Sequence, residues 1–121
     1  MIDPATLAVY RQTAQARQQA QRAVIEARRQ RAWQVAKQAA VLLRHDFGVS
    51  RIVVFGSITS EKLFHVHSDI DLAIWGLSER VYFRAVGVLQ GIDAEFSMDL
   101  IRFEDASPTF QEAIRQGGIE L

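Results

Sequence analysis

Residues 5–47 combine good helix formers with a complete absence of helix breakers. Between Ala5 and Phe47 there is no Gly and no Pro, and Ala, Gln and Arg dominate. Pro4 suits the first turn of a helix, Asp3 is a candidate cap, and Gly48 is a natural stop. The pattern predicts helical structure over residues 5–47.

The spacing of the apolar positions changes midway through this helical stretch. A stripe at steps of three and four, typical of a helix that faces a core, consists of Trp33, Ala36, Ala40, Leu43 and Phe47. The thinner stripe before it consists of Leu7, Tyr10, Ala14, Val24 and Ile25. Because one helix over the whole stretch would be unusually long for a globular domain, we expect a domain helix over residues 33–47. Residues 5–31 would form a weakly amphipathic extension, either a separate helix or a projecting arm.

Three short segments of the remaining chain have the pattern of β-strands. Ile52–Phe55 is an uninterrupted apolar run, as expected for a strand that is buried on both faces. Asp69–Trp75 alternates acidic and aliphatic side chains, and Glu95–Phe103 is again strand-like. The helices predicted beside these strands cover Thr59–Phe64, Ser78–Gly91 and Ser107–Gly117. This alternation indicates the α/β (α+β) class, with an N-terminal extension over residues 1–31 and one domain over residues 32–121.

Composition supports a small folded domain. The 121 residues suffice for one domain with a buried core, and 49% of them are apolar and 23% charged. The sequence has no cysteine, which excludes disulfides and thiolate metal sites and fits a cytoplasmic location. We see no secretory signal after Met1 and no apolar run near the roughly 18 residues of a membrane span, so we expect no membrane partner.

Charge is divided between two parts of the chain, although the formal net charge is zero. Residues 1–47 hold eight Arg and Lys against three acids, whereas residues 48–121 hold six against eleven. The basic part suggests an acidic partner or nucleic acid, and the acidic part suggests cations. No aromatic residues interleave with these arginines like a base-stacking surface, which favours protein contact over nucleic acid. A solvated basic helix is the plain alternative.

Two aspartates lie two residues apart on the second predicted strand. Asp69 and Asp71 therefore project from one face, with Cα atoms about 6.5–7 Å apart. Two like charges at this spacing repel each other unless a cation lies between them. Mg²⁺ fits, because it prefers oxygen and is usually held by one or two carboxylates together with substrate phosphates. The competing interpretation is a solvated strand edge.

A third acid, Asp99, lies in the last predicted strand. If this strand pairs beside Asp69–Trp75, Asp99 joins the same face as Asp71. Three carboxylates around two metal ions suit in-line phosphoryl transfer, in which one ion activates the attacking oxygen and the other neutralises the leaving pyrophosphate. We therefore predict that Asp69, Asp71 and Asp99 are catalytic and bind metal.

Gly56 and Ser57 follow the first predicted strand. A glycine at such a turn lets the backbone approach a phosphate closely, and the following amides and the Ser57 hydroxyl can bind triphosphate oxygens. A Gly-Ser pair alone is also common in plain turns. Its combination with the aspartate strand and Asp99 is far more specific.

Together, Phe55–Ser57, Ser68–Ile74 and Asp99–Ile101 resemble the minimal nucleotidyltransferase branch of the polymerase-β-like superfamily. The resemblance covers about residues 33–121. It implies the polymerase-β palm fold, a small mixed sheet flanked by helices, with Mg²⁺ as cofactor and transfer of AMP from ATP to a hydroxyl. In that family the Gly-Ser pair holds phosphates and the three aspartates bind metal. These roles fall on Gly56, Ser57, Asp69, Asp71 and Asp99.

The resemblance also implies a partner. Stand-alone members are often encoded beside HEPN-domain proteins as toxin–antitoxin pairs, in which the transferase is the antitoxin and some members adenylylate a tyrosine of the HEPN ribonuclease. We therefore expect a hetero-oligomer with a HEPN-type toxin that docks on residues 1–31, and contact with nucleic acid only through that partner.

One segment departs from the family pattern. The Gly-Ser pair usually continues into an Arg-rich, Gly-containing turn, whereas Ile58–Glu61 contains neither residue. An acid at position 61 near the triphosphate would repel it. A non-catalytic antitoxin that masks its toxin by binding is therefore the alternative. A third possibility, a small-molecule transferase of the aminoglycoside type, usually carries an extra helical domain that is absent from these residues.

Several further side chains near these motifs could serve the site or be ordinary structural residues. Candidates for phosphate, metal or partner contact are Lys62, His65, His67, Arg80 and Arg84, and candidates for stacking on a base are Trp33 and Trp75.

Overall fold

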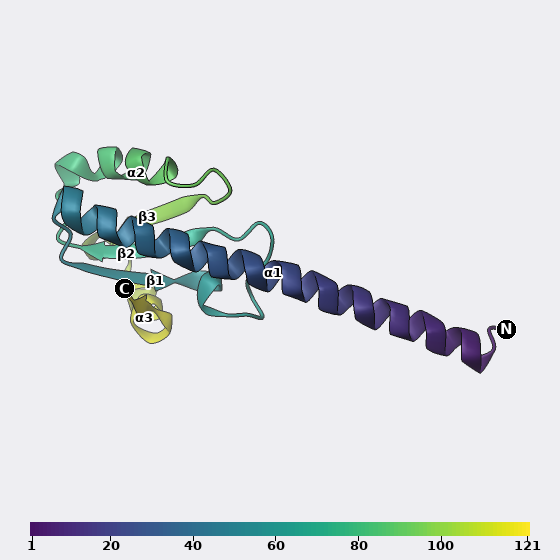
Figure 1. Cartoon of the computed structure of the whole chain (residues 1–121). Helices are drawn as coiled ribbons and strands as arrows, with labels where there is room; N and C mark the ends of the chain where they lie inside the picture. Colours follow the sequence, from purple (N-terminus) through teal and green to yellow (C-terminus); the bar gives the residue numbers. More distant parts are fainter.

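The computed structural model describes all residues from Met1 to Leu121, and one long N-terminal helix dominates its shape (Figure 1). Helix α1 (Pro4–Phe47) contains 44 residues without interruption, so the domain helix expected over residues 33–47 is the C-terminal part of one longer helix. The predicted helix ends are confirmed. The Asp3 carboxylate accepts a hydrogen bond from the Thr6 amide at 2.8 Å, and Gly48 ends the helix with a φ of 66°.

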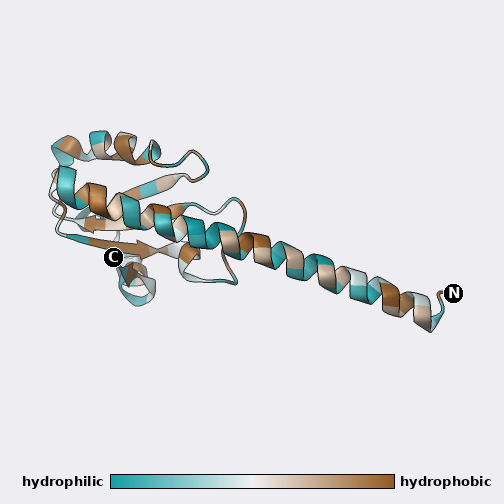
Figure 2. Cartoon of the chain, viewed as in Figure 1, coloured by the Kyte–Doolittle hydropathy of each residue, from teal (hydrophilic) through white to brown (hydrophobic).

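The N-terminal part of α1 projects from the domain, which is the second of the two alternatives for this segment (Figure 1). Residues 1–24 are all exposed, and the first partly buried residue is Ile25. We call residues 4–24 the arm. At a rise of about 1.5 Å per residue it extends about 32 Å. Figure 2 shows polar and apolar residues interspersed along it, which explains why it does not pack into a core.

Four strands form one mixed sheet in the order β3-β2-β1-β4. Their bounds are β1 (Arg51–Phe55), β2 (Ile70–Trp75), β3 (Met98–Arg102) and β4 (Ile119–Glu120). β1 pairs antiparallel with β2 and β4, whereas β2 pairs parallel with β3. The β2–β3 pairing is the one on which the placement of Asp99 depended, and its register sets Asp71 opposite Asp99.

The sheet separates two apolar layers of unequal size. On one face, α1 and α2 (Tyr82–Gln90) cover a cluster of 20 buried residues. On the other face, α3 (Pro108–Gly117) lies beside a cluster of Val53, Phe55, Ala73, Phe103 and Ile114 (Figure 1). Because side chains alternate along a strand, Asp71 shares the face of Ala73. The acids therefore lie on the α3 side of the sheet.

The connections differ from the expected helices in two places. The helix predicted over Thr59–Phe64 is wrong, because the chain forms a short 3-10 helix η1 (Gly56–Thr59) and becomes extended at Ser60. The helix predicted from Ser78 begins as a 3-10 turn, η2 (Glu79–Val81), which Ser78 caps. A third 3-10 turn, η3 (Phe103–Asp105), follows β3.

The C-terminal elements combine a confirmed prediction with an unexpected strand. Ser107 caps α3 by accepting a hydrogen bond from the Phe110 amide at 3.2 Å, as predicted. The two-residue strand β4 was not expected, because its sequence has too few residues to show a period. None of the helices has both the length and the apolar character that crossing a membrane would need.

Candidate active site

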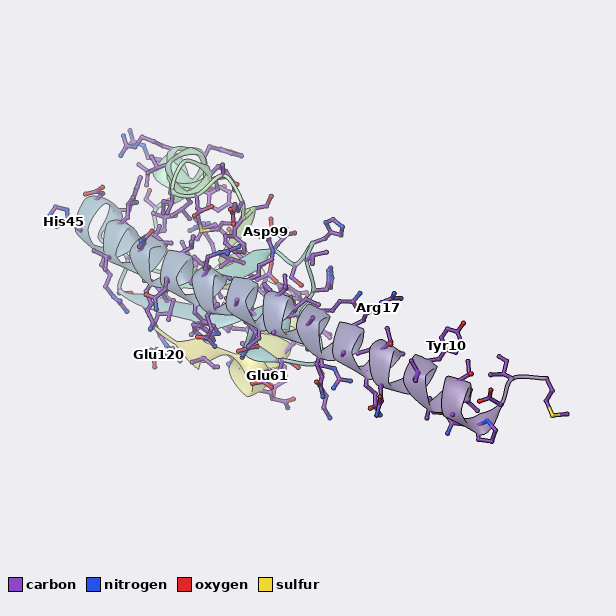
Figure 3. All side chains as sticks on the ribbon, turned by 45° about the vertical axis from the view of Figure 1, so that its right-hand side comes forward. Tyr10, Arg17, His45, Glu61, Asp99 and Glu120 are labelled. Carbon is purple, nitrogen blue, oxygen red and sulfur yellow. The ribbon has the colours of Figure 1, made fainter.

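The three predicted aspartates lie at one end of the sheet. Phe55, the last residue of β1, is the register partner of Asp71, and Asp71 is the register partner of Asp99 in β3. Asp69 immediately precedes β2 and is exposed, as is Asp99, whereas Asp71 is half-buried. In Figure 3, Asp99 lies toward the end of the domain from which the arm projects. The structure thus brings Asp71 and Asp99 together, with Asp69 near enough to repel the Asp71 carboxylate.

The ionisation of Asp71 reflects this crowding. Burial raises the pKa of Asp71 to about 6, and repulsion from Asp99, a side-chain hydrogen bond with Asp99 and repulsion from Asp69 act in the same direction. A carboxyl group in this environment binds a proton or a cation near neutral pH. A cation held by both carboxylates would lower the pKa of Asp71 again.

Gly56 brings the turn after β1 directly against Asp71. Its φ of 80° lies in the left-handed region, which glycine adopts with little strain. A Cβ atom at this position would also collide with Oδ2 of Asp71. The positive φ therefore favours glycine at position 56, and a larger residue there would also have to displace the Asp71 carboxylate.

The short helix η1 begins at Gly56, and its polar residues Ser57 and Thr59 line the groove as well. No side chain caps its N-terminal end, so its first amides are not satisfied by a cap. The Thr59 hydroxyl donates to the Gly56 carbonyl at 2.8 Å, and the Ser60 amide donates to the Ser57 carbonyl at 3.0 Å. Ser57 is half-buried and lies next to Gly56, as expected for the predicted phosphate-binding pair.

An open groove of about 570 Å³ joins the acids to the turn. This volume is within the usual range of small-molecule sites, about 300–1,000 Å³. The lining residues are Phe55, Gly56, Ser57, Thr59, Leu63, Asp71, Asp99, Ile101, Phe110, Ala113 and Gly117. The groove therefore has a polar wall from η1, β2 and β3 and an apolar wall formed mainly by α3 and Phe55 of β1.

The donor chemistry of the groove fits Mg²⁺. Asp71 and Asp99 offer hard carboxylate oxygens, and no histidine lines the groove. The structure contains no ready-made cluster of three or more metal-ligating side chains. This arrangement suits an ion that is held by one or two carboxylates and completed by substrate phosphates. The role of Asp69 as a further ligand stays a prediction.

The two histidines before Asp69 lie outside the groove. His65 and His67 are both exposed, and the His67 amide donates to Nδ1 of His65 at 3.1 Å. Lys62 and Glu61 line a separate hollow that they share with Arg22 of the arm. The acid at position 61, which the sequence placed near the phosphates, is thus not a lining residue of the groove.

The two tryptophans and Arg84 pack against other side chains outside the groove, whereas Arg80 is exposed. Trp75 stacks on Phe103 with ring centroids 4.5 Å apart, and Trp33 packs against the main core. Arg84 lies 5.5 Å from the centre of the Phe47 ring, on the α1–α2 side of the sheet. Arg80 is exposed near the start of α2. None of these four candidates lines the groove.

The apolar wall of the groove was missed by the sequence analysis. Phe110, Ala113 and Gly117 come from one side of α3, and the Phe110 ring packs edge-on against Phe55 at 5.6 Å. Their spacing of three and four residues places them on a single helix face. The sequence alone could therefore have predicted that these three residues share one surface. Ile101, two residues after Asp99, joins the wall because it lies on the same face of β3.

Sequence comparison decides the family. Residues 37–121 match the family model described as polymerase beta, nucleotidyltransferase, which is more than half of the chain. The chain belongs to the polymerase beta nucleotidyltransferase family. No curated protein matches this nucleotidyltransferase significantly in sequence.

Solved structures confirm the predicted fold of this nucleotidyltransferase. A chain from a toxin–antitoxin crystal structure with AMP-PNP superposes with a TM-score of 0.57 at 22% identity, covering 69% of each chain. A chain from the complex of the tri-AMPylated Shewanella oneidensis HEPN toxin with its MNT antitoxin gives 0.57 at 19% identity, covering 74% of this chain and 70% of that one. A minimal nucleotidyltransferase structure gives 0.52 at 23% identity, covering 83% and 95%.

The family match also delimits what is particular to this nucleotidyltransferase. It begins at residue 37, so the arm and the first partly buried turns of α1 lie outside it. Everything that lines the groove lies inside it. The groove therefore lies within the family match, whereas the arm lies outside it.

Proposed function

We propose that this nucleotidyltransferase transfers AMP from ATP, with Mg²⁺, to a tyrosine hydroxyl of a HEPN-type toxin and thereby neutralises the toxin. The observation that carries the proposal is the pairing of Asp71 with Asp99 in register, next to the turn at Gly56 whose backbone lies against the Asp71 carboxylate. The neighbours with this fold include structures of a toxin–antitoxin with AMP-PNP and of an AMPylated HEPN toxin.

Each group of the groove has a role in this proposal. Asp71 and Asp99, with Asp69 beside them, would hold Mg²⁺, which neutralises charge on the triphosphate when bound. The amides of Gly56 and Ser57 and the Ser57 hydroxyl would bind phosphate oxygens. The apolar wall around Phe110 offers a surface for a flat base.

The transfer of AMP is a substitution at the α-phosphorus of ATP. The acceptor oxygen forms a bond to the α-phosphorus, the bond from that phosphorus to the bridging oxygen of the β-phosphate breaks, and pyrophosphate leaves. The hydroxyl loses its proton, and the exposed carboxylate of Asp99 is the base that we assign to receive it. No oxidant or further reactant is needed.

The arm supports a protein as acceptor. It carries Arg11, Arg17 and Arg22, and no acid lies between residues 4 and 25. These three arginines take part in none of the ion pairs of the structure. An acidic surface on the partner would complement them, and we propose that the partner docks there, within the cytoplasm.

The alternative is an antitoxin that masks its toxin without modifying it. The favouring observation is that no Arg or Lys lines the groove, although a triphosphate carries several negative charges. Lys62, the nearest basic residue in sequence to η1, lines the neighbouring hollow instead. In this case the arm would still bind the toxin, while the groove would no longer catalyse the transfer of AMP.

The two functions are separated by one experiment. The protein is incubated with ATP, Mg²⁺ and a HEPN-type partner protein, and the intact mass of that partner is measured. The proposal expects an increase by the mass of AMP, which Asp71→Asn and Asp99→Asn abolish. Unchanged mass, together with tight binding and equal neutralisation by Asp71→Asn, would establish the masking function instead.

A further inference from the structure

An arginine of α1 forms a hydrogen bond with η1, the predicted phosphate-binding turn. Nε of Arg29 donates a hydrogen bond to the Ile58 carbonyl at 2.7 Å, across 29 residues of sequence. The Arg29 side chain is only 13% exposed. Ile58 is the third residue of η1, directly after the predicted phosphate-binding pair Gly56 and Ser57. The contact therefore joins the long helix to the turn that the groove depends on.

Glu26 fixes the other edge of the same guanidinium group. Nη1 of Arg29 lies 3.1 Å from Oε1 of Glu26, one turn earlier on α1. Glu26 is itself held by Gln30, whose side-chain amide donates to Oε1 at 2.8 Å. Because the arginine is already neutralised by Glu26, its effect on the turn comes from a directed hydrogen bond more than from net charge.

The turn is short, and its own hydrogen bonds are few: the Thr59 hydroxyl donates to the Gly56 carbonyl and the Ser60 amide to the Ser57 carbonyl. η1 has four residues and no side-chain cap, so it lacks the repeated internal bonds of a longer helix. The Ile58 side chain is fully buried in the main core, which anchors one side of the backbone. Arg29 restrains the carbonyl of the same residue. The backbone at Ile58 is thus fixed by two contacts from different elements.

We propose that Arg29 is a positioning residue that orients η1 so that the amides of Gly56 and Ser57 face a bound triphosphate. This inference rests on the proposed nucleotide-binding function of the groove. It also gives a reason for the composition of Ile58–Glu61, which contains no arginine. The turn receives its guanidinium contact from α1, at a residue outside the family match.

Arg28 provides a matched control on the same helix. Its Nη2 donates to the Glu95 carbonyl at 2.8 Å, and its side chain is 19% exposed. It therefore makes the same kind of bond from α1 to a loop carbonyl, with similar burial, but to the loop before β3 instead of η1. Loss of either arginine should lower the melting temperature by a similar amount.

The experiment compares wild type, Arg29→Ala, Arg29→Lys and Arg28→Ala as full-length proteins. Isothermal titration calorimetry measures the Kd for AMP-PNP with Mg²⁺, and hydrogen exchange measures protection of the backbone at residues 56–60 and 93–97. We expect Arg29→Ala to weaken AMP-PNP binding about ten-fold and to speed exchange at 56–60. Arg28→Ala should leave the Kd within about two-fold and speed exchange at 93–97 only.

The lysine variant separates geometry from charge. Lysine keeps the positive charge but lacks the planar fork, so Arg29→Lys should restore little of the lost affinity. If Arg29→Lys bound AMP-PNP as tightly as wild type, the role of a directed hydrogen bond from Arg29 would be overturned. Unchanged Kd and unchanged exchange at 56–60 in folded Arg29→Ala would overturn the inference entirely. If wild type binds no AMP-PNP, the proposed function fails, while the exchange at 56–60 still decides whether Arg29 holds the turn.

Discussion

Gly56 and Asp71 lie so close together that a Cβ atom at position 56 would collide with Oδ2 of Asp71. The two residues come from different elements, η1 and β2, and they meet because Phe55 and Asp71 are register partners in the antiparallel pair. The carboxylate that would hold a metal ion and the backbone that would hold phosphates are thus parts of one contact. A change at either residue has to affect both functions.

Replacing Gly56 by alanine should disable the groove. The methyl group would push Asp71 away and the left-handed φ would become strained, which costs about 1–3 kcal/mol of stability. We expect AMP transfer to be lost and the melting temperature to fall, as measured by intact mass and thermal unfolding. The control is Gly87→Ala in α2, where a Cβ meets nothing within 4 Å. Retained transfer by Gly56→Ala would contradict the tight contact.

Stability of the metal-free protein should fall as the pH rises through the pKa of Asp71. The pKa of this carboxyl is near 3.8, the ordinary value for an aspartate, in the unfolded chain and about 6 in the folded protein. Between these values the folded state holds more protons, so its stability is full below pH 3.8 and declines toward and above pH 6. Asp71 is partly exposed, so screening limits the effect to on the order of 1 kcal/mol.

Urea unfolding in EDTA at pH 5 and pH 7.5 measures this effect. Wild type should be more stable at the lower of the two pH values, and Asp71→Asn should remove most of the difference. The comparison with Asp71→Asn matters because histidines titrate in the same range. An equal pH dependence in both proteins would show that Asp71 ionises normally.

Mg²⁺ should stabilise the protein most where Asp71 is ionised. A cation between Asp71 and Asp99 replaces the shared proton and relieves their repulsion. Thermal unfolding at pH 7.5 should therefore show a rise in melting temperature with Mg²⁺ that is absent from the Asp71→Asn/Asp99→Asn double variant. A rise of the same size in the double variant would place the ion elsewhere.

Removing residues 1–24 should separate chemistry from partner binding. These residues are entirely exposed, so the shortened protein should keep its melting temperature and its affinity for AMP-PNP. Binding of the HEPN-type protein, measured by biolayer interferometry, should weaken at least about ten-fold, because three unpaired arginines are lost. Replacing Arg11, Arg17 and Arg22 by glutamine is the milder control for helix loss. Full AMP transfer by the shortened protein would contradict a docking role for the arm.

Local patterns of the sequence were sufficient to predict β1, β2 and β3 and to single out the acidic residues. Alternation along Asp69–Trp75 set Asp71 on one face, and helix-capping residues such as Ser107 were found where the sequence placed them. These features depend on neighbours within a few residues, so the sequence carries them directly. The parallel pairing that sets Asp99 opposite Asp71 was a conditional expectation, and the structure supplied it.

Features that depend on distant contacts could not be read in this way. The thin apolar stripe before Trp33 suggested a break in the helix, but the stripe reports where a core lies and not where a helix ends. β4 forms only because Val53 and Val54 provide partners for Ile119 and Glu120. The contact of Arg29 with Ile58 likewise requires α1 to cross the end of the sheet, which no local pattern shows.

The continuity of α1 sets a scale for whatever the protein handles. Tyr10 and the first partly buried residue, Ile25, are separated by about 22 Å of unbroken helix, which cannot fold back on itself. A body that touches the distal end of α1 and also enters the groove must span at least that length, about the width of a small folded domain. If the partner docks on the arm as proposed, lengthening or shortening the helix would change the size of the partner that can reach both the arm and the groove.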